Sequence, residues 1–476
     1  MDDGMKHAVI VGGGIAGLSA AYYLQQKAAN AGIPVQVTLY EAGPAGGGKI
    51  VTDRRDGFVI EGGPDTFLAT KPWGVALCRD LGLEPGLQGT NPDQKNTYVL
   101  HHGRLIPLPD GLTMMIPTRF APMVSTRLLS WPAKVRMGLD FIMPPQRANG
   151  DESLGAFVSR RLGRPAYERL IEPLMSGIYA GDGDQLSLQS TFPYLRELEM
   201  KYGGLVRGAL DMRRKIKKNG GSAPGTRSAF LTPQAGLAAI VEALVERISA
   251  AGGSLQAGVS VRRMAQEEQG YRLALGNGEN RHADGVILAT PAFVSGDLFV
   301  DMHADLAADL RSIPYVSTAT VSLAYAQNDL PRPLDGYGYV IPRREGRRAL
   351  ACTWTSTKFP HRAPQGYALL RVFIGRAGQE ADLPTDEAGL RHLAQEELAL
   401  TLGISAPPLF TRVFYWERAM PQYNLGHPRR LERIDAALEG FPGLALAGNG
   451  YRGIGIPDCI HSGDVAAEQL IRHFLS

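Results

Sequence analysis

The sequence predicts an α/β protein in which one domain is assembled from three separate segments, with a mixed β-sheet domain and a mainly helical insert between them. Three observations carry this prediction. A strand, a glycine-rich turn and a helix open the chain, alternating apolar patterns fill residues 317–375, and a second glycine-rich turn follows an apolar strand near residue 447. At 476 residues the chain is long enough for more than one hydrophobic core.

The first segment has the pattern of a Rossmann-like dinucleotide-binding unit. Residues 8–11 form an apolar strand, and Gly12, Gly14 and Gly17 follow at G-x-G-x-x-G spacing. The first glycine permits the turn, the second lets a pyrophosphate approach, and the third lets a helix predicted at 15–27 pack on the sheet. A second strand at 35–40 ends at Glu41, which is placed to accept both ribose hydroxyls. The predicted cofactor contacts here are Gly12, Gly13, Gly14, Ile15, Ala16, Gly17, Glu41 and Ala42.

Composition narrows the class of protein. The net charge is +3, from 50 basic and 47 acidic residues, so no nucleic-acid partner is predicted. The three cysteines are scattered and no ligand spacing is present, so no metal site is predicted. The sequence has no signal-peptide pattern and no uninterrupted apolar run of about 18 residues, so we expect a cytoplasmic protein. Peripheral contact with the inner face of the cell membrane and the oligomeric state are left open.

Two later segments complete the discontinuous domain. An amphipathic helix is predicted at 237–251, short strands at 259–261 and 271–275, and a buried strand at 285–290. A strand at 444–447 then leads into a glycine-rich loop and a helix at 460–474. The predicted boundaries are 1–53, 231–296 and 411–476 for this domain, 54–104, 212–230 and 297–410 for the sheet domain, and 105–211 for the insert.

The insert has helical apolar spacing at 126–141, 153–162, 165–174 and 191–202. Its large apolar residues either pack in a core, which we prefer, or face a membrane or a substrate channel; they include Met114, Met115, Phe120, Met123 and Trp131. Residues 215–225 are predicted to form a loop, residues 317–375 an antiparallel sheet that floors a pocket, and residues 384–402 a helix with a solvated face.

Several segments resemble the flavin-binding amine oxidase and protoporphyrinogen oxidase superfamily. Glu41-Ala42 continues to Gly47-Gly48-Lys49 and to the turn Glu61-Gly62-Gly63-Pro64, although Ala45 stands where the family often has arginine. The C-terminal G-I-G-I-P-D-C-I, the A-C-T-W-T segment from Ala351 and the W-E-R-A-M-P-Q-Y segment from Trp416 are similar to the Gram-positive-type porphyrinogen oxidases. The resemblance implies FAD, with further contacts at Gly48, Lys49, Gly62, Gly63, Pro64, Asp65, Val261, Trp416, Gly448, Gly453, Ile454, Gly455 and Ile456.

The resemblance also implies a reaction. Members of this branch oxidise coproporphyrinogen III in haem biosynthesis, removing six electrons with three O2 consumed and three H2O2 formed, and protoporphyrinogen IX is a substitute substrate. Because the flavin carries hydride transfer, no catalytic side chain is nominated. Lys71 is the candidate cation for a substrate carboxylate, and the pocket-wall candidates are Ile341, Thr353 and Trp354. A basic cluster, predicted to be a solvated hairpin tip, comprises Arg343, Arg344, Arg347 and Arg348.

Alternatives differ in substrate and in class. A protoporphyrinogen IX oxidase shares the fold and the mechanism, and an amine- or carotenoid-oxidising flavoenzyme is more distant. A flavin- or porphyrin-binding protein that hands its ligand to a haem-pathway enzyme is the non-enzymatic alternative. Transient contact with such enzymes is also left open for an oxidase.

Overall fold

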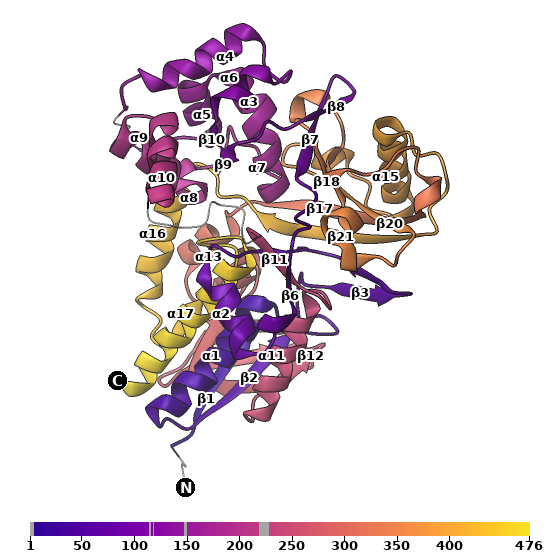
Figure 1. The fold of residues 1–476 in the computed structure, drawn as a ribbon. Coiled ribbons are helices and arrows are strands. Elements are labelled where there is room, and N and C mark those ends of the chain that lie inside the picture. Colours follow the sequence, from indigo (N-terminus) through magenta and orange to yellow (C-terminus); the bar gives the residue numbers. More distant parts are fainter. Residues whose placement is uncertain (1–3, 114–115, 118, 147–149, 219–227) are drawn as a thin grey trace.

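The structure, a computed structural model, describes residues 4–113, 116–117, 119–146, 150–218 and 228–476. Its lower layer in Figure 1 is a five-stranded parallel sheet with the order β12-β2-β1-β16-β22. The five strands come from three distant parts of the chain, which confirms the predicted α/β class. They are β1 (Lys6–Val11), β2 (Val35–Glu41), β12 (Ser254–Ala257), β16 (Gly285–Leu288) and β22 (Leu444–Leu446).

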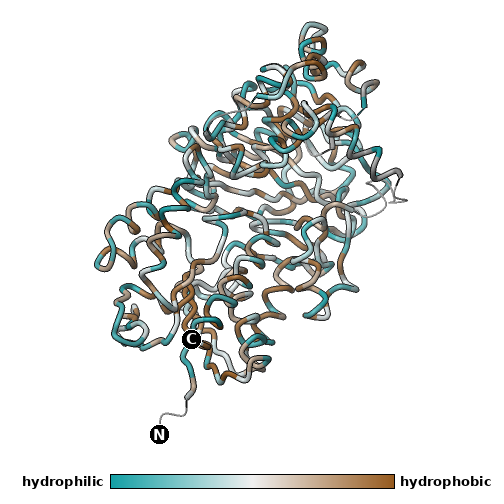
Figure 2. Tube along the Cα trace, turned by 90° about the vertical axis from the view of Figure 1, so that its left-hand side faces the viewer, coloured by the Kyte–Doolittle hydropathy of each residue, from teal (hydrophilic) through white to brown (hydrophobic). Residues whose placement is uncertain are grey.

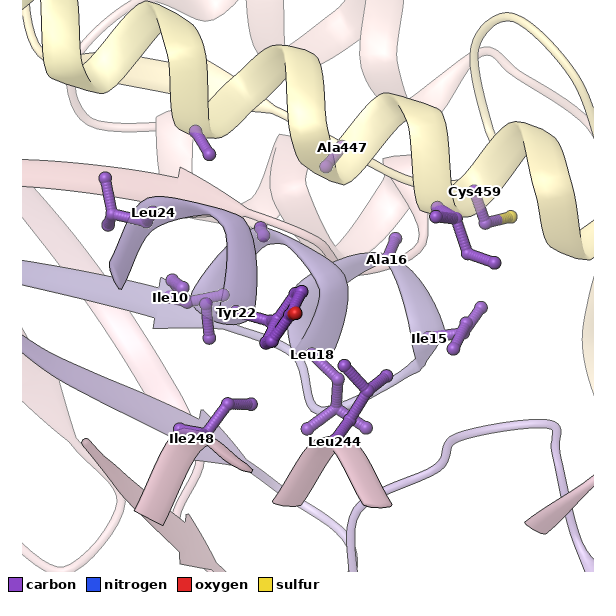
Figure 3. Close-up of a cluster of buried hydrophobic side chains, with 14 of the residues drawn as sticks. Ile10, Ile15, Ala16, Leu18, Tyr22, Leu24, Leu244, Ile248, Ala447 and Cys459 are labelled. Atoms are coloured by element: carbon purple, nitrogen blue, oxygen red, sulfur yellow. The ribbon is translucent and has the colours of Figure 1, made fainter. Parts of the chain in front are cut away.

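Three helices pack around this sheet: α1 (Ile15–Ala31), α11 (Ala238–Ala250) and α17 (Ile456–Leu475). Figure 3 shows α1 between α17 and α11, with Leu18, Tyr22 and Leu244 among the side chains that fill the core. Helix α1 runs one turn beyond the predicted 15–27 and ends where Gly32 adopts a left-handed conformation, φ 67°. Helix α17 begins at Ile456 rather than at the predicted residue 460, because Pro457 suits the first turn of a helix.

The second layer is a seven-stranded mixed sheet with the order β21-β17-β20-β19-β18-β7-β8. The predicted antiparallel strands at 317–375 are present, and β7 adds a parallel pairing with β18. One face packs against α15 (Glu387–Leu402), and its side chains form a separate hydrophobic core. The strands are β7 (Asn96–His101), β8 (Arg104–Pro107), β17 (Tyr315–Ala326), β18 (Gly336–Val340), β19 (Ala349–Trp354), β20 (Tyr367–Ile374) and β21 (Phe410–Pro421).

The third part is a helical cap at the top of Figure 1, with its own core. The predicted helix at 126–141 is shorter, because it starts at Trp131 ahead of Pro132 and tightens into a 3-10 turn, η2 (Leu139–Phe141). The helix predicted at 165–174 is divided into α6, a π-helical turn and α7, with Pro173 in the first turn of α7. The helices are α3 (Phe120–Ser125), α4 (Trp131–Gly138), α5 (Leu154–Leu162), α6 (Arg164–Ala166), η3 (Tyr167–Ile171), α7 (Glu172–Tyr179), α8 (Leu188–Thr191), α9 (Pro193–Tyr202) and α10 (Leu205–Lys218).

Two predictions for this region fall wholly or partly on residues that the structure does not describe. Met114 and Met115 lie outside the described residues, as does most of the loop expected at 215–225, although residues 215–218 belong to α10. Met123 is buried in the core of the cap and Trp131 is exposed. Within the described part of the chain, no helix is long and apolar enough to cross a membrane.

Smaller elements connect these layers. Figure 2 shows hydrophobic stretches running through the interior of the lower part of the molecule, where the parallel sheet lies, and hydrophilic stretches at its periphery. The remaining strands are β3 (Thr52–Arg55), β4 (Phe58–Glu61), β5 (Phe67–Leu68), β6 (Leu87–Gly89), β9 (Leu112–Thr113), β10 (Ile116–Pro117), β11 (Phe230–Pro233), β13 (Val261–Gln266), β14 (Tyr271–Leu275) and β15 (Asn280–Ala283). The remaining α-helices are α2 (Pro72–Asp80), α12 (Ala292–Phe299), α13 (Ala304–Arg311), α14 (Thr355–Lys358) and α16 (His427–Leu438).

Candidate active site

The turn after β1 has the geometry of a pyrophosphate cradle. Gly12 has φ 105°, and a Cβ there would lie 2.8 Å from the Ala289 carbonyl oxygen, so only glycine fits. A Cβ on Gly17 would lie 1.9 Å from the Gly12 carbonyl oxygen, whereas a Cβ on Gly14 would meet no atom within 4 Å. The space that Gly14 leaves open lies at the start of α1, where unpaired backbone N–H groups bind phosphate.

Glu41 lies at the carboxyl end of β2, beside this turn. Its carboxylate accepts hydrogen bonds from the backbone N–H of Gly13 at 2.7 Å and of Gly43 at 2.6 Å. The Glu41 carbonyl accepts a bond from Val259, two residues before Val261 starts β13. The structure therefore places Glu41 and Ala42 close to the start of β13, where Val261, another predicted FAD contact, lies.

The segment at 47–49 closes the other side of the cradle. Gly47 pairs with Gly14, and the Gly47 N–H donates to the Gly13 carbonyl at 2.7 Å. Lys49 follows, and burial lowers the pKa of its ammonium to about 8, an effect that the Cys459 thiol opposes. Cys459 lies in the first turn of α17, so Lys49 lies between the cradle and that helix.

The Gly62–Asp65 turn is held by three side chains from the large sheet. Thr320 Oγ1, Trp416 Nε1 and Arg371 Nη2 all donate to the Gly62 carbonyl, at 2.7, 2.9 and 3.2 Å. Arg371 also donates to the Gly63 carbonyl. Trp416, predicted as an FAD contact, therefore holds this turn by a hydrogen bond, and Thr320 and Arg371 do the same.

A cluster of charges surrounds the same turn. The buried Glu61 carboxylate accepts hydrogen bonds from the buried Arg362 side chain at 2.8 Å and from the half-buried Thr52 hydroxyl at 2.7 Å. Lys358 Nζ lies 3.4 Å from Asp65 Oδ2. Burial acts to raise the pKa of Asp65, but Lys358, Arg371 and Arg362 outweigh it and lower that pKa, so Asp65 is ionised at neutral pH. Two carboxylates and three cations leave one excess positive charge at this turn.

The glycine-rich loop before α17 forms the last part of the site. Gly448 and Gly453 have φ 118° and 134°, and a Cβ on Gly453 would lie 2.5 Å from Asp458. The buried Tyr423 hydroxyl accepts from the Gly453 N–H at 2.9 Å and donates to the Asn449 carbonyl at 2.6 Å. This loop carries the remaining predicted contacts Ile454, Gly455 and Ile456, with Ile454 packed against the cap.

The predicted substrate residues separate into three environments. Lys71 is paired with Asp458, at 2.5 and 2.7 Å from the two carboxylate oxygens. Ile341 and Trp354 are buried in the core on the α15 side of the sheet, and Trp354 also lines a pocket of about 290 Å³ with Tyr98 and Arg332. Thr353 alternates with Trp354 along β19, pairs with Arg371 and therefore lies on the face that carries the Gly62 contacts.

Sequence reasoning missed three groups of this site. The sequence separation is 301 positions between Arg362 and Glu61, 309 between Arg371 and Gly62, and 293 between Lys358 and Asp65. No local spacing connects residues so far apart. Lys358 is part of the segment that carries the family resemblance, which was the available signal. The described residues contain no group of three or more His, Cys, Asp or Glu side chains able to hold a metal.

The basic cluster after β18 is only partly a solvated tip. Arg343 Nη2 donates to the Ala377 carbonyl at 2.9 Å, and Arg344 Nη1 lies 3.2 Å from Glu168 on the cap. Both arginines therefore bind neighbouring structure, while Arg348 is exposed.

The parallel sheet, the open space at Gly14 and the paired Glu41 define a dinucleotide-binding α/β protein. Comparison with known proteins gives the family: the sequence pattern of the flavin-containing amine oxidoreductases matches residues 15–471. The chain belongs to this family, and a flavin at a dinucleotide site gives FAD as the cofactor.

Relatives extend over the whole chain. The coproporphyrinogen III oxidase of Bacillus subtilis is 38% identical and covers 100% of both chains. That of Staphylococcus aureus is 36% identical over 98% of this chain and 99% of its own. A solved structure from Exiguobacterium sp. 255-15, provisionally described as a protoporphyrinogen oxidase, has a TM-score of 0.86 at 33% identity and covers 98% of each chain.

Proposed function

We propose that this protein is an oxygen-dependent coproporphyrinogen III oxidase that forms coproporphyrin III in haem biosynthesis. The observation that carries this proposal is the excess positive charge at the Gly62–Asp65 turn, next to the cofactor segments. A tetracarboxylate substrate requires such charge beside an apolar surface. The names of the full-length relatives point to the same substrate.

The residues of this chain bind the cofactor and position the substrate. The cradle at Gly12–Gly17, Glu41 and the 448–456 loop would hold FAD, which when bound accepts hydride equivalents and returns them to O2. Thr320, Arg371 and Trp416 fix the Gly62–Asp65 turn, so this turn is preorganised before substrate binds. Lys358, whose ion pair with Asp65 is long at 3.4 Å, is the cation that can exchange that pair for a substrate carboxylate.

Six electrons and six hydrogens leave the macrocycle for each product. The site therefore operates three times on one substrate, with three O2 consumed and three H2O2 formed. Thr353 and its neighbours on the Gly62 side of the sheet would contact the ring system throughout. No step requires a side-chain base in this proposal.

Turnover of the two porphyrinogens tests the substrate. Purified protein is supplied with coproporphyrinogen III or protoporphyrinogen IX in air, and product is followed by porphyrin fluorescence together with H2O2. We expect a higher kcat/KM with coproporphyrinogen III. A preference of about tenfold or more for protoporphyrinogen IX, or activity only on an amine or a carotenoid, would overturn the proposal. A bound flavin that neither porphyrinogen reduces would favour a carrier protein.

We further propose that the enzyme works in the cytoplasm and transiently contacts the inner face of the cell membrane, where it can meet other enzymes of the haem pathway. Support comes from an apolar surface of the cap, comprising Val124, Trp131, Val135, Leu139, Phe141 and Ile142. Trp131, Val135 and Ile142 are 66%, 65% and 71% exposed, and Lys134 lies over the Trp131 ring. Aromatic and basic side chains together favour an anionic lipid surface.

A further inference from the structure

Lys71 and Asp458 form an ion pair between the starts of two helices. Lys71 immediately precedes α2, and Asp458 lies in the first turn of α17. The lysine directs its ammonium at both carboxylate oxygens, and Asp458 Oδ2 also accepts from the Gly455 N–H at 3.3 Å. The Asp458 side chain is only 13% exposed. A substrate carboxylate could recruit Lys71 only by breaking this pair.

Two further contacts hold the same helix ends together. The rings of Trp73 and His461 stack at 4.0 Å with an angle of 7° between their planes. A Cβ on Gly74 would lie 3.3 Å from Pro457, so α2 approaches α17 closely. The pair is therefore part of a fixed junction between α2 and α17 and not a contact between two mobile side chains.

The charges at this junction are few. The Cys459 thiol stays neutral, because burial raises its pKa to about 12. The charged groups of the described chain that act on this thiol are then Asp458, Lys71 and Lys49. The N-terminus of α17 contributes roughly half a positive charge, and a full negative charge in its first turn would outweigh that field if it were uncompensated.

We infer that Lys71 acts on the flavin through Asp458: it neutralises this carboxylate so that the N-terminus of α17 presents positive potential to the cofactor. This inference rests on the proposed function, in which the 448–456 loop helps to hold FAD; since the cradle and Glu41 would take the pyrophosphate and the ribose, the flavin ring falls to this loop. Reduction adds negative charge to the ring, and a nearby positive potential stabilises that charge. Lys71 is therefore a positioning residue that sets the flavin potential.

The midpoint potential of the bound FAD tests this inference without substrate. Wild type, Lys71→Met, Asp458→Asn and the double variant are titrated with dithionite against a reference dye. We expect Lys71→Met to shift the potential to more negative values and Asp458→Asn to shift it to more positive values. The double variant should return close to wild type, and Lys71→Arg should resemble wild type.

A matched control lies further along the same helix. Lys27 pairs with Glu468 at 2.9 Å and with Asp464 at 3.2 Å, so Lys27→Met removes a comparable α17 ion pair away from its N-terminus. We expect this variant to keep the wild-type potential. A shift as large as that of Lys71→Met would mean that loss of any α17 ion pair perturbs the cofactor, and would overturn the inference.

Direct substrate binding by Lys71 gives a different pattern. Lys71→Met would then raise the KM for coproporphyrinogen III, leave the potential unchanged, and show no dependence on Asp458, and that result would also overturn the inference. Failure of the proposed function gives a different result: in the wild-type protein, dithionite would reduce the bound flavin but neither porphyrinogen would.

Discussion

The backbone N–H of Arg343 donates to the Glu172 carboxylate at 3.1 Å, which joins the turn after β18 to α7 in the helical cap. Burial raises the pKa of Glu172, while Arg376 and Arg343 partly offset that effect. The Arg343 side chain adds its bond to Ala377. The cap and the sheet are thus connected by a buried carboxylate and the cations that compensate it.

Replacing Arg343 with methionine should weaken this connection. We expect the free energy of unfolding to fall by about 1–2 kcal/mol, because the side-chain hydrogen bond to the Ala377 carbonyl is lost and Glu172 loses a compensating charge, while the backbone bond to Glu172 remains. Urea denaturation measures the change. The matched control is Arg348→Met, an exposed neighbour in the same cluster, and equal effects of the two substitutions would contradict the assignment.

Alanine substitutions at Gly14 and Gly17 should separate cofactor binding from folding. Gly14→Ala places a Cβ in open space, so the apoprotein should keep its stability while the Kd for FAD rises by about tenfold or more. Gly17→Ala drives a Cβ into the Gly12 carbonyl and should destabilise the apoprotein by about 1–3 kcal/mol. Flavin fluorescence titration and thermal unfolding check the pair. An unchanged Kd in Gly14→Ala would show that phosphate does not use this space.

Lys358→Met should weaken substrate binding more than it slows the chemical step. The lost contact to a carboxylate is worth about 1.5–3 kcal/mol, so KM for coproporphyrinogen III should rise roughly 10- to 100-fold with a smaller change in kcat. Lys95→Met, an exposed lysine, is the control. A wild-type KM in Lys358→Met would assign the substrate carboxylates to other cations.

Acid should destabilise the protein through His427. This side chain is fully buried, lies 2.8 Å from the Tyr451 carbonyl and stacks on Tyr423, and burial lowers its pKa to about 4. An unfolded histidine has a pKa of about 6.5, so between these values the unfolded chain binds a proton that the folded chain does not. Stability is therefore highest above pH 6.5 and should fall by up to about 3 kcal/mol toward pH 4.

The variant His427→Gln isolates this contribution. Its urea midpoint should depend less on pH between 7 and 4.5 than that of wild type, although it is less stable at every pH. His361, whose pKa is also lowered to about 4 by burial, accounts for part of the dependence that remains. An identical pH dependence in the two proteins would exclude His427 as the titrating group.

The apolar surface of the cap should direct binding to anionic vesicles. Trp131→Ser with Val135→Ser should reduce co-flotation with phosphatidylglycerol vesicles, because exposed apolar area is lost while Lys134 is kept. Leu400→Ser, an exposed leucine on α15, is the control. If the wild-type protein stayed in the soluble fraction at low salt and did not float with the vesicles, the membrane proposal would be overturned.

The sequence predicted the cofactor half of the molecule more completely than the substrate half. The turn at Gly12–Gly17 and the acid at Glu41 follow each other along the chain, so local spacing determines their geometry. Helix limits differed where proline controls the first turn, as at Pro132 and Pro457. These are local effects that a pattern of apolar residues does not encode.

The substrate side depends on strand pairing that spacing does not predict. Thr353 and Trp354 are adjacent in sequence, but β19 directs them to opposite faces of the sheet, and only the pairing with β20 decides which face meets Arg371. Lys71 was predicted to bind a substrate carboxylate, but its ammonium pairs with Asp458, which lies 387 positions away. Partners at such separations are brought together by the tertiary fold alone.

The close packing of α1 on α17 has a consequence for how the chain acquires its structure. A Cβ on Gly463 would lie 2.4 Å from the Ala16 carbonyl, and α17 covers the first helix along much of its length. During synthesis, β1 and α1 emerge from the ribosome long before β22 and α17 exist to cover them. The core between these two helices can therefore be completed only after synthesis has passed α17, so the first strand and helix of the parallel sheet wait for a partner made more than 400 residues later.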